Sequence, residues 1–400
     1  MTTTLNIAEQ LAAITGPEHV RTEDIITVSP ANTQQVSAIL RYANENGLTV
    51  TPTGGNAKQT WGNPAKTNIR LSLTRLNRVL EHPWQDLTCT VQAGCTWATL
   101  QQTLAKHGQF VALDPLWPER ATVGGILATN DSGAIRHRYG SLRDLVIGMT
   151  LVLADGTIAR TGGKVVKNVA GYDLSKLVTG SFGTLAVITE ATFRLHPLPQ
   201  HAQTFTVSAP QAAQLAPLMQ SIRASHLLTQ ALQLRGDANG FHLDIQLNAH
   251  PEARQNEILE QMTEAADLKL DQGQSEIWQA REELFTHEEA FTLKLTMLPS
   301  ELTEIVAYLA RCEATSVIQS LGIAYVKLPA PNHNSVMHIE LLEDLLEKGG
   351  GSLTILKEPR SLQHDLREIL DKSVLPLMQA IKHQFDPNRT LNPGRFLGGI

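Results

Sequence analysis

Two glycine pairs constrain the fold of this 400-residue chain more than any other feature of its sequence. Gly54-Gly55 follows a strand-like segment and begins the polar loop 54–62, and Gly124-Gly125 lies in the small-residue segment 118–133. Glycine lets the backbone adopt positive φ and approach another surface closely, and successive N–H groups in such a loop form a nest that binds anions. The first loop is therefore a candidate phosphate cradle, and the second segment is a candidate surface for something flat or bulky that lies against the backbone. A simple turn explains the first equally well, and tight strand–helix packing explains the second.

Neither segment matches a common nucleotide-binding motif. The first is not G-x-G-x-x-G, and Gly163-Lys164 is followed by Val165 without the upstream glycine of G-x-x-x-x-G-K-[ST]. The sequence therefore supports neither a Rossmann dinucleotide site nor a P-loop.

The first half of the chain alternates strand-like and helical patterns. Asn32 and Thr96 are candidate N-caps, Gly47 and Gly108 are suited to the position after a helix, and Asp155-Gly156 is a strong hairpin signal. The patterns predict helices over 33–46 and 97–107, and strands over 25–28, 48–51, 87–93, 145–154, 157–161 and 185–195.

The proline-rich segment 196–199 predicts a domain boundary, because prolines cannot continue a central strand. Beyond it, glycine becomes rarer, helices are predicted over 251–267, 301–315 and 362–383, and 236–240 predicts a hairpin turn. The carboxylate-rich run 282–289 predicts an exposed helix face. We expect three parts: a domain over 1–199, a smaller α+β domain over 200–375, and a tail over 376–400.

Composition excludes several classes of protein. The formal charge of −6 argues against a nucleic-acid binder, and 42% hydrophobic residues provide a sizeable core. The longest nearly apolar run, 145–154, is about half of what a membrane span needs, and the N-terminal residues do not resemble a signal peptide. Cys89, Cys95 and Cys312 form no C-x-x-C pair, so we expect reduced thiols.

A third block completes a recognisable pattern: Lys167-Asn168-Val169-Ala170-Gly171-Tyr172-Asp173, followed by Gly180-Ser181-Phe182-Gly183-Thr184-Leu185-Ala186-Val187-Ile188-Thr189-Glu190. In this order the three blocks resemble the FAD-binding domain of the vanillyl-alcohol oxidase superfamily, the PCMH type. The resemblance covers roughly 17–199, and 385–395 resembles the superfamily's returning tail. Within the superfamily, Gly55-Asn56 and 166–173 are most similar to the E-type subunits of bacterial glycolate oxidases.

The resemblance implies an α+β fold: a PCMH-type FAD-binding domain of two α+β subdomains, a smaller α+β cap domain, and a tail that returns to the FAD domain. Residues 52–60 would surround the FAD pyrophosphate. Residues 122–133 would lie beside the ribityl chain and the isoalloxazine, with Tyr139-Gly140 near the same face. Val187 and Ile188 would meet the adenine end through backbone atoms. The implied cofactor-binding residues are Pro52, Thr53, Gly54, Gly55, Asn56, Ala57, Thr60, Pro118, Thr122, Val123, Gly124, Gly125, Thr129, Asn130, Ser132, Gly133, Tyr139, Gly140, Val187 and Ile188.

Two departures from the superfamily pattern refine this expectation. Members with covalent flavin have histidine directly after the paired glycines, where this chain has Asn56, and 122–133 contains no cysteine. We therefore expect non-covalent FAD. The D-2-hydroxyacid dehydrogenases carry His-x-Gly-Asp-Gly-Asn-x-His in the cap. The nearest match here, 236–239, is better explained as a hairpin, so we expect no metal site, and the catalytic base stays unknown.

The resemblance implies an FAD-dependent oxidoreductase that acts on the CH–OH group of 2-hydroxy acids. It would be the FAD-binding subunit of a glycolate oxidase that forms glyoxylate. Its partners would be a D-type flavin subunit and an F-type iron–sulfur subunit, in the cytoplasm or held at the inner membrane by the complex. Two alternatives stay open: a stand-alone D-2-hydroxyacid dehydrogenase, and a flavin-holding assembly subunit without turnover.

Overall fold

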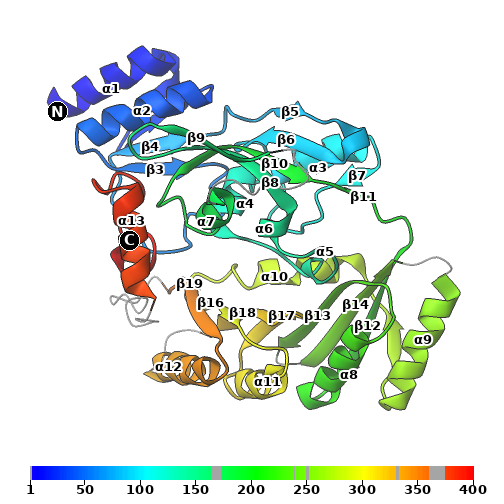
Figure 1. Cartoon of the computed structure of the whole chain (residues 1–400). Coiled ribbons are helices and arrows are strands. Elements are labelled where there is room, and N and C mark those ends of the chain that lie inside the picture. Colours follow the sequence, from blue (N-terminus) through cyan, green and yellow to red (C-terminus); the bar gives the residue numbers. More distant parts are fainter. Residues whose placement is uncertain (1, 164–172, 238, 249–251, 330–332, 360–373) are drawn as a thin grey trace. The chain divides into compact units, whose positions relative to one another are not determined.

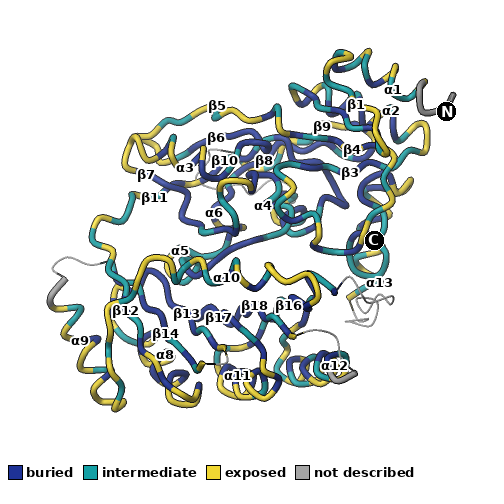
Figure 2. Tube along the Cα trace, turned by 180° about the vertical axis from the view of Figure 1, so that it is seen from behind, coloured by how far each residue is buried: buried dark blue, intermediate teal, exposed yellow. Residues whose placement is uncertain are grey.

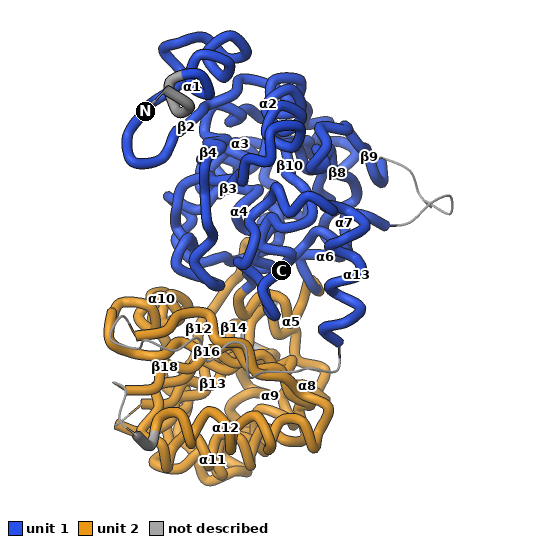
Figure 3. Tube along the Cα trace, turned by 90° about the vertical axis from the view of Figure 1, so that its left-hand side faces the viewer, with its two compact units in different colours: residues 1–132, 141–198, 372–400 blue, residues 133–140, 199–371 orange. Residues whose placement is uncertain are grey.

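A computed structural model describes residues 2–163, 173–237, 239–248, 252–329, 333–359 and 374–400. The chain divides into two compact units, coloured separately in Figure 3. Unit 1 comprises Met1–Ser132, Ser141–Leu198 and Lys372–Ile400, and unit 2 comprises Gly133–Gly140 and Pro199–Asp371. The third sequence block lies partly in 164–172, outside the described residues.

The first part of unit 1 is a small sheet with two parallel pairings. Its strand order is β1-β2-β4-β3, in which β2 and β3 both run parallel to β4. The bounds are β1 Val20–Thr22, β2 Ile26–Val28, β3 Val50–Thr53 and β4 Ile69–Ser72, with helices α1 Thr2–Thr15 and α2 Thr33–Glu45. The α2 helix begins where the sequence predicts, because the side chain of Asn32 accepts the N–H of Gln35 at 2.9 Å.

The second part of unit 1 is an antiparallel sheet of order β5-β6-β10-β8-β9. The bounds are β5 Val79–Glu81, β6 Thr88–Gln92, β8 Val146–Val152, β9 Ile158–Gly162 and β10 Val187–Arg194, with a two-stranded ribbon of β7 Gln109–Phe110 and β11 His196–Pro197. Helices α3 Trp97–Ala105, α4 Val123–Thr129, α6 Leu142–Leu145 and α7 Leu174–Val178 complete it. The hairpin at Asp155-Gly156 is confirmed, since β8 pairs with β9 around it.

The C-terminal tail belongs to unit 1, as the sequence predicts. Within 362–383 the structure describes a helix only at α13, Leu375–Phe385; 360–373 lies outside the described residues. Buried Lys382 donates to Asp386 at 2.6 Å, to the carbonyl of Thr184 at 2.7 Å and to that of Leu391 at 2.8 Å. Backbone bonds join Val50 to Thr390 and Asn392. These bonds place the tail beside β3 and the β10 segment.

Unit 2 is built on an eight-stranded antiparallel sheet of order β15-β12-β14-β13-β17-β18-β16-β19. Its strands are β12 Ala202–Ala209, β13 Thr229–Asp237, β14 Gly240–Asn248, β15 Leu270–Gln272, β16 Phe291–Thr296, β17 Thr315–Gln319, β18 Ile323–Leu328 and β19 Ser352–Lys357. Its helices are α5 Arg136–Tyr139, α8 Ala212–Ala224, α9 Glu252–Ala265, α10 Ala280–Glu283, α11 Leu302–Arg311 and α12 His333–Lys348. Asp237 pairs with Gly240, which confirms the predicted hairpin.

The two faces of this sheet differ in chemistry. Helices α8, α11 and α12 cover one face, and their apolar residues form one buried core with those of the strands (Figure 1). Helices α5 and α10 lie on the other side of the sheet (Figure 1). On this second face the strands carry polar residues such as Gln233, Asp244 and Tyr325, which are almost fully buried. Figure 2 shows that the strands of this sheet are mostly buried, whereas the outer helices carry many exposed residues.

The α+β fold class is confirmed. The prediction of one exposed helix over 282–289 is wrong: the helix ends at Glu283, a turn follows, and Arg281 at its start is buried. Among the described residues, no helix is long and apolar enough to cross a membrane.

Candidate functional site

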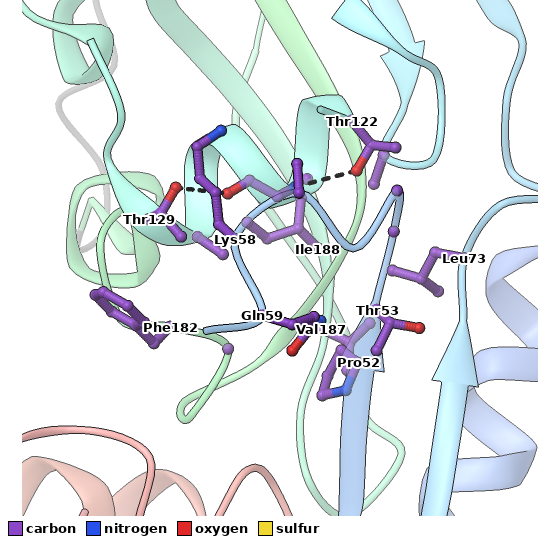
Figure 4. Close-up of a pocket in the computed structure, with 18 of the residues that line it drawn as sticks. Pro52, Thr53, Lys58, Gln59, Leu73, Thr122, Thr129, Phe182, Val187 and Ile188 are labelled. Atoms are coloured by element: carbon purple, nitrogen blue, oxygen red, sulfur yellow. Dashed lines mark hydrogen bonds between the residues drawn. The ribbon is translucent and has the colours of Figure 1, made fainter. Parts of the chain in front are cut away.

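A cavity of about 790 Å³ in unit 1, open to solvent, is the candidate functional site (Figure 4). Four segments far apart in sequence line it: the loop after β3, the start and body of α4, the segment before and into β10, and the returning tail.

The paired glycines of the first loop are required for packing. A Cβ at Gly54 would collide with the hydroxyl of Thr122, and a Cβ at Gly55 would collide with the carbonyl oxygen of Arg120. The loop therefore lies directly against the segment that leads into α4. Only residues without a side chain allow this contact at these two positions.

The backbone N–H groups of this loop lack acceptors. Within the described residues, the amides of Gly54, Gly55, Asn56 and Ala57 donate no hydrogen bond, although all four residues line the cavity. Asn56 adopts positive φ (55°). Four successive donors at one edge of a cavity suit phosphate oxygens, as in anion-binding nests.

The second glycine pair contributes in two different ways. Thr122 caps α4 by accepting the N–H of Gly125 at 3.4 Å, and a Cβ at Gly124 would lie 2.9 Å from that of Ala93. Gly124 is thus a packing residue. A Cβ at Gly125 would meet only the Thr122 hydroxyl, at 3.3 Å. Gly125 therefore leaves space in the cavity itself.

The tail adds polar groups to the cavity. Asn392 donates through Nδ2 to the carbonyl of Phe182 at 2.8 Å, while its buried Oδ1 has no partner among the described residues. Arg395 donates to the side chain of Gln59 at 2.8 Å, and to the carbonyls of Lys58 and Gln59 at 3.3 and 3.1 Å. The guanidinium thus brings positive charge to the loop with the free amides.

The structure brings twelve of the twenty predicted residues together around this cavity. They are Pro52, Thr53, Gly54, Gly55, Asn56, Ala57, Thr122, Gly124, Gly125, Thr129, Val187 and Ile188. The other eight do not line it: Thr60, Pro118, Val123, Asn130, Ser132, Gly133, Tyr139 and Gly140. Of these, Val123 lies in the hydrophobic core, and Gly133, Tyr139 and Gly140 belong to unit 2.

The cavity also contains residues that the predicted set did not name individually, although Lys58 and Gln59 lie within the predicted range 52–60 and Ala128 lies within 122–133. They are Lys58, Gln59, Leu73, Ala93, Ala121, Ala128, Ser181, Phe182, Gly183, Ala186, Asn392 and Arg395. Ser181 to Gly183 lie in the block 180–190, and Asn392 and Arg395 lie in the tail segment 385–395, so the resemblance could have indicated these residues. Leu73 and Ala93 carry no motif, and only the fold brings them to the site.

Cys95 lies closer to the second block than the sequence indicates. Its carbonyl accepts the N–H of Val123 at 2.9 Å. The thiol, however, is in the hydrophobic core with Cys89, and burial raises the pKa of Cys95 above its ordinary value. Cys89 and Cys95 are thus core residues, and neither lines the cavity.

Unit 2 contains a second polar cluster, formed by Arg281, Lys294 and Tyr325. Tyr325 is fully buried, and its hydroxyl has no hydrogen-bond partner among the described residues. The guanidinium carbon of Arg281 lies 4.9 Å from the centre of the Tyr325 ring, and Nζ of Lys294 lies 5.9 Å from it. Two cations therefore flank a phenol without an acceptor. Within the described residues, no three His, Cys, Asp or Glu side chains gather as a metal site.

Comparisons with known proteins identify the first cavity's domain. Residues 25–162 match the family described as "FAD binding domain", and 362–396 match "FAD linked oxidases, C-terminal domain". Both segments are therefore similar to domains of FAD-linked oxidases. FAD is the cofactor of this chain.

Individual relatives agree with this assignment. The chain is 26% identical to "Glycolate oxidase subunit GlcD" of Bacillus subtilis, over 98% of this chain and 97% of that one. It is 26% identical to "D-lactate dehydrogenase" of Anaerostipes hadrus, over 92% and 89%. Its fold is similar to the solved structure of p-cresol methylhydroxylase, with a TM-score of 0.77 at 15% identity over 99% and 97% of the two chains. The PCMH-type fold is thereby confirmed.

The residues of the cavity fit FAD. The four loop amides and Arg395 would bind the phosphate groups, and the unpaired Oδ1 of Asn392 would accept a hydroxyl or N–H of the cofactor. The open side of Gly125 leaves room for a flat or extended group against α4.

Proposed function

We propose that this FAD-linked oxidase oxidises a small 2-hydroxy acid, with glycolate as the first candidate, and works as the FAD-binding subunit of a complex. The observation that carries the proposal is the cluster of Arg281, Lys294 and Tyr325 in unit 2. Each member is suited to a carboxylate, the group that all 2-hydroxy acids share.

The geometry of the cluster supports an anionic ligand. A buried hydroxyl without a partner costs about 1 to 3 kcal/mol, so the phenol of Tyr325 is expected to have an acceptor when the protein is functional. The neighbouring cations favour an acceptor that is negatively charged. Arg281 is 5% exposed, and such a desolvated guanidinium binds a carboxylate more strongly than an exposed one does.

The names of two relatives support the same chemical class. Glycolate and D-lactate, in the names of the Bacillus and Anaerostipes proteins, are both 2-hydroxy acids. The word "subunit" in the first name supports a complex. We propose a D-type flavin protein and an F-type iron–sulfur protein as partners. A stand-alone D-2-hydroxyacid dehydrogenase is the second candidate, supported by the nearly full-length match to D-lactate dehydrogenase.

The division of chemical roles follows from the residues. Bound FAD would supply two-electron oxidation, which the protein's side chains cannot perform. The cavity of unit 1 would position the cofactor through the loop amides and Arg395. Arg281, Lys294 and the Tyr325 hydroxyl in unit 2 would hold the carboxylate of the acid.

A variant of Tyr325 tests the acid-binding role. Tyr325→Phe removes a hydroxyl without a partner, so the unfolding free energy should stay constant or rise slightly. The KM for glycolate or D-lactate should rise about five-fold or more, the equivalent of about 1 kcal/mol for one hydrogen bond. The matched control is Tyr308→Phe, because Tyr308 also lies beside an arginine, at 5.8 Å, but already bonds His338. An unchanged KM in Tyr325→Phe would refute the acid-binding role.

The subunit role needs a separate measurement. Turnover of glycolate and D-lactate with a dye acceptor is measured for the chain alone and after addition of the candidate D- and F-type proteins. Activity that requires the partners supports the complex. Turnover by the chain alone at rates typical of enzymes, on the order of 1 to 1,000 per second, would favour the stand-alone dehydrogenase. No turnover in either condition would favour an assembly subunit.

A further inference from the structure

Lys58 is an unusual residue in the cofactor cavity, because it is a lysine that is almost fully buried. Its side chain is 5% exposed, and Nζ lies 3.0 Å from Oδ2 of Asp131, whose side chain is 0% exposed. The same carboxylate oxygen accepts the backbone N–H of Leu116 at 2.8 Å. The ion pair therefore ties the cofactor loop to the segments on both sides of α4.

The position of the ammonium group argues against a direct role in binding phosphate. Nζ is held by groups of the protein, since it also donates to the carbonyl of Leu116 at 3.4 Å. Nζ lies 5.7 Å from the ring centres of both Trp61 and Trp117. The carboxylate of Asp131 balances its charge at close range, so the pair offers little net charge to an anion.

The loop that carries Lys58 must be held from outside to keep its amides directed to the cavity. Gly54 and Gly55 pack against Thr122 and Arg120, and Arg395 donates to the carbonyls of residues 58 and 59. These contacts hold the start and the far side of the loop. The Lys58–Asp131 pair is a charged bond between the loop and the segment that follows α4.

Stability alone does not explain such a pair. Removing two charges from water opposes folding, and replacing a buried ion pair with neutral residues of similar size often leaves stability unchanged or increases it. A directional bond between two buried groups instead favours one loop conformation over others. Here that conformation is the one in which four adjacent N–H groups have no acceptor except a ligand.

We propose that Lys58 is a positioning residue for FAD: its ion pair with Asp131 holds loop 54–59 in the cofactor-binding conformation, and the ammonium does not bind the phosphates itself. The alternative, in which Lys58 is a phosphate ligand, makes the opposite prediction for one variant. Asp131→Asn removes the competing carboxylate but keeps an acceptor for Leu116. It should strengthen FAD binding if Lys58 binds phosphate, and weaken it if the pair positions the loop.

The experiment is a titration of the FAD-free full-length chain with FAD, followed by quenching of flavin fluorescence. We expect Asp131→Asn to raise the Kd about ten-fold or more. The isosteric neutral variant Lys58→Met/Asp131→Asn should bind FAD as weakly, with circular dichroism and a melting temperature close to those of the wild type. The control is Lys176→Met, which breaks the half-exposed pair with Asp173 in the same unit and should leave the Kd unchanged.

Two results would overturn the proposal. An unchanged or lower Kd in Asp131→Asn is one. If that single variant does not fold, the Kd of the neutral double variant is measured at several salt concentrations, because an electrostatic contact with phosphate weakens as ionic strength rises. A salt dependence of the Kd equal to that of the wild type supports positioning, whereas a smaller dependence shows that Lys58 contacts the phosphates.

Discussion

Gly125 provides a test in which stability and cofactor affinity should change in opposite directions. It lies within α4, and a Cβ there would meet only the Thr122 hydroxyl, at 3.3 Å. Glycine within a helix costs about 0.5 to 1 kcal/mol relative to alanine. Gly125→Ala should therefore raise the melting temperature of the FAD-free protein by about 1 to 4 °C, given about 2 to 4 °C per kcal/mol for a domain of this size.

The same position limits the space for FAD. Extra methyl groups in a filled site cost about 1 to 3 kcal/mol, which corresponds to about a 5- to 150-fold weaker Kd. Gly125→Val should show this loss in a fluorescence titration, and Gly125→Ala should show a smaller one. The contrasting variant is Gly55→Ala, whose Cβ would collide with the backbone carbonyl of Arg120. Gly55→Ala should therefore lower the melting temperature of the FAD-free protein.

The result that refutes this reasoning is specific. If Gly125→Val folds with the circular dichroism spectrum of the wild type and binds FAD with the same Kd, the cofactor does not occupy the open side of α4. A matched control is Gly163→Ala, because a Cβ at Gly163 has no neighbour within 4 Å and Gly163 does not line the cavity. Its Kd should equal that of the wild type.

Three further predictions concern the tail, the cofactor linkage and pH. Lys382→Met leaves the carboxylate of Asp386, 0% exposed, without its cation, and should lower the unfolding free energy by about 3 to 5 kcal/mol; a urea midpoint equal to that of the wild type would contradict this. Acid or heat should release all of the FAD, because Asn56 replaces the histidine of covalent relatives; flavin retained on the denatured chain would disprove it. Burial, with smaller contributions from Arg223 and Arg138, lowers the pKa of His137. Below about pH 6.5 the unfolded chain therefore binds a proton that the folded chain does not, and the stability of the folded chain falls on acidification. His137→Gln should reduce this loss of stability in melting experiments between pH 7 and 5, and an unchanged pH dependence of the melting temperature would contradict the prediction.

The sequence predicted the secondary structure correctly where it depends on interactions between neighbouring residues, as in helix caps and tight turns. Asn32 and Thr96 cap α2 and α3 through side-chain bonds to the third following residue, and Asp155-Gly156 makes the β8–β9 turn. The helix α4 was not predicted, because its glycine pair and small residues suppress the helical pattern. Its cap, Thr122, is the one local signal that indicates it.

The cofactor loop shows the limit of reasoning from motifs. The sequence predicts that Gly54 and Gly55 allow close approach to a ligand, whereas the structure shows them in contact with Thr122 and Arg120 of the same chain. A glycine in the sequence indicates that another group lies close to the backbone, but it does not indicate whether that group belongs to the protein or to a ligand. Only the fold distinguishes these packing glycines from Gly125, whose open side faces the cavity.

The cluster of Arg281, Lys294 and Tyr325, which we propose to bind the acid, could not be found from sequence because sheet register creates it. Arg281 stands in a run of carboxylates that suggests an exposed helix, and Lys294 and Tyr325 are separated by 31 positions along the chain. Antiparallel pairing of β16 with β18 places Lys294 directly opposite Tyr325, and directly paired residues of a sheet share a face. In the proposed function, the carboxylate of the acid is bound without a histidine motif, since the pairing of two ordinary strands supplies a cation and a phenol. The catalytic base is unknown, and the proposed subunit role predicts that turnover of the acid depends on a partner.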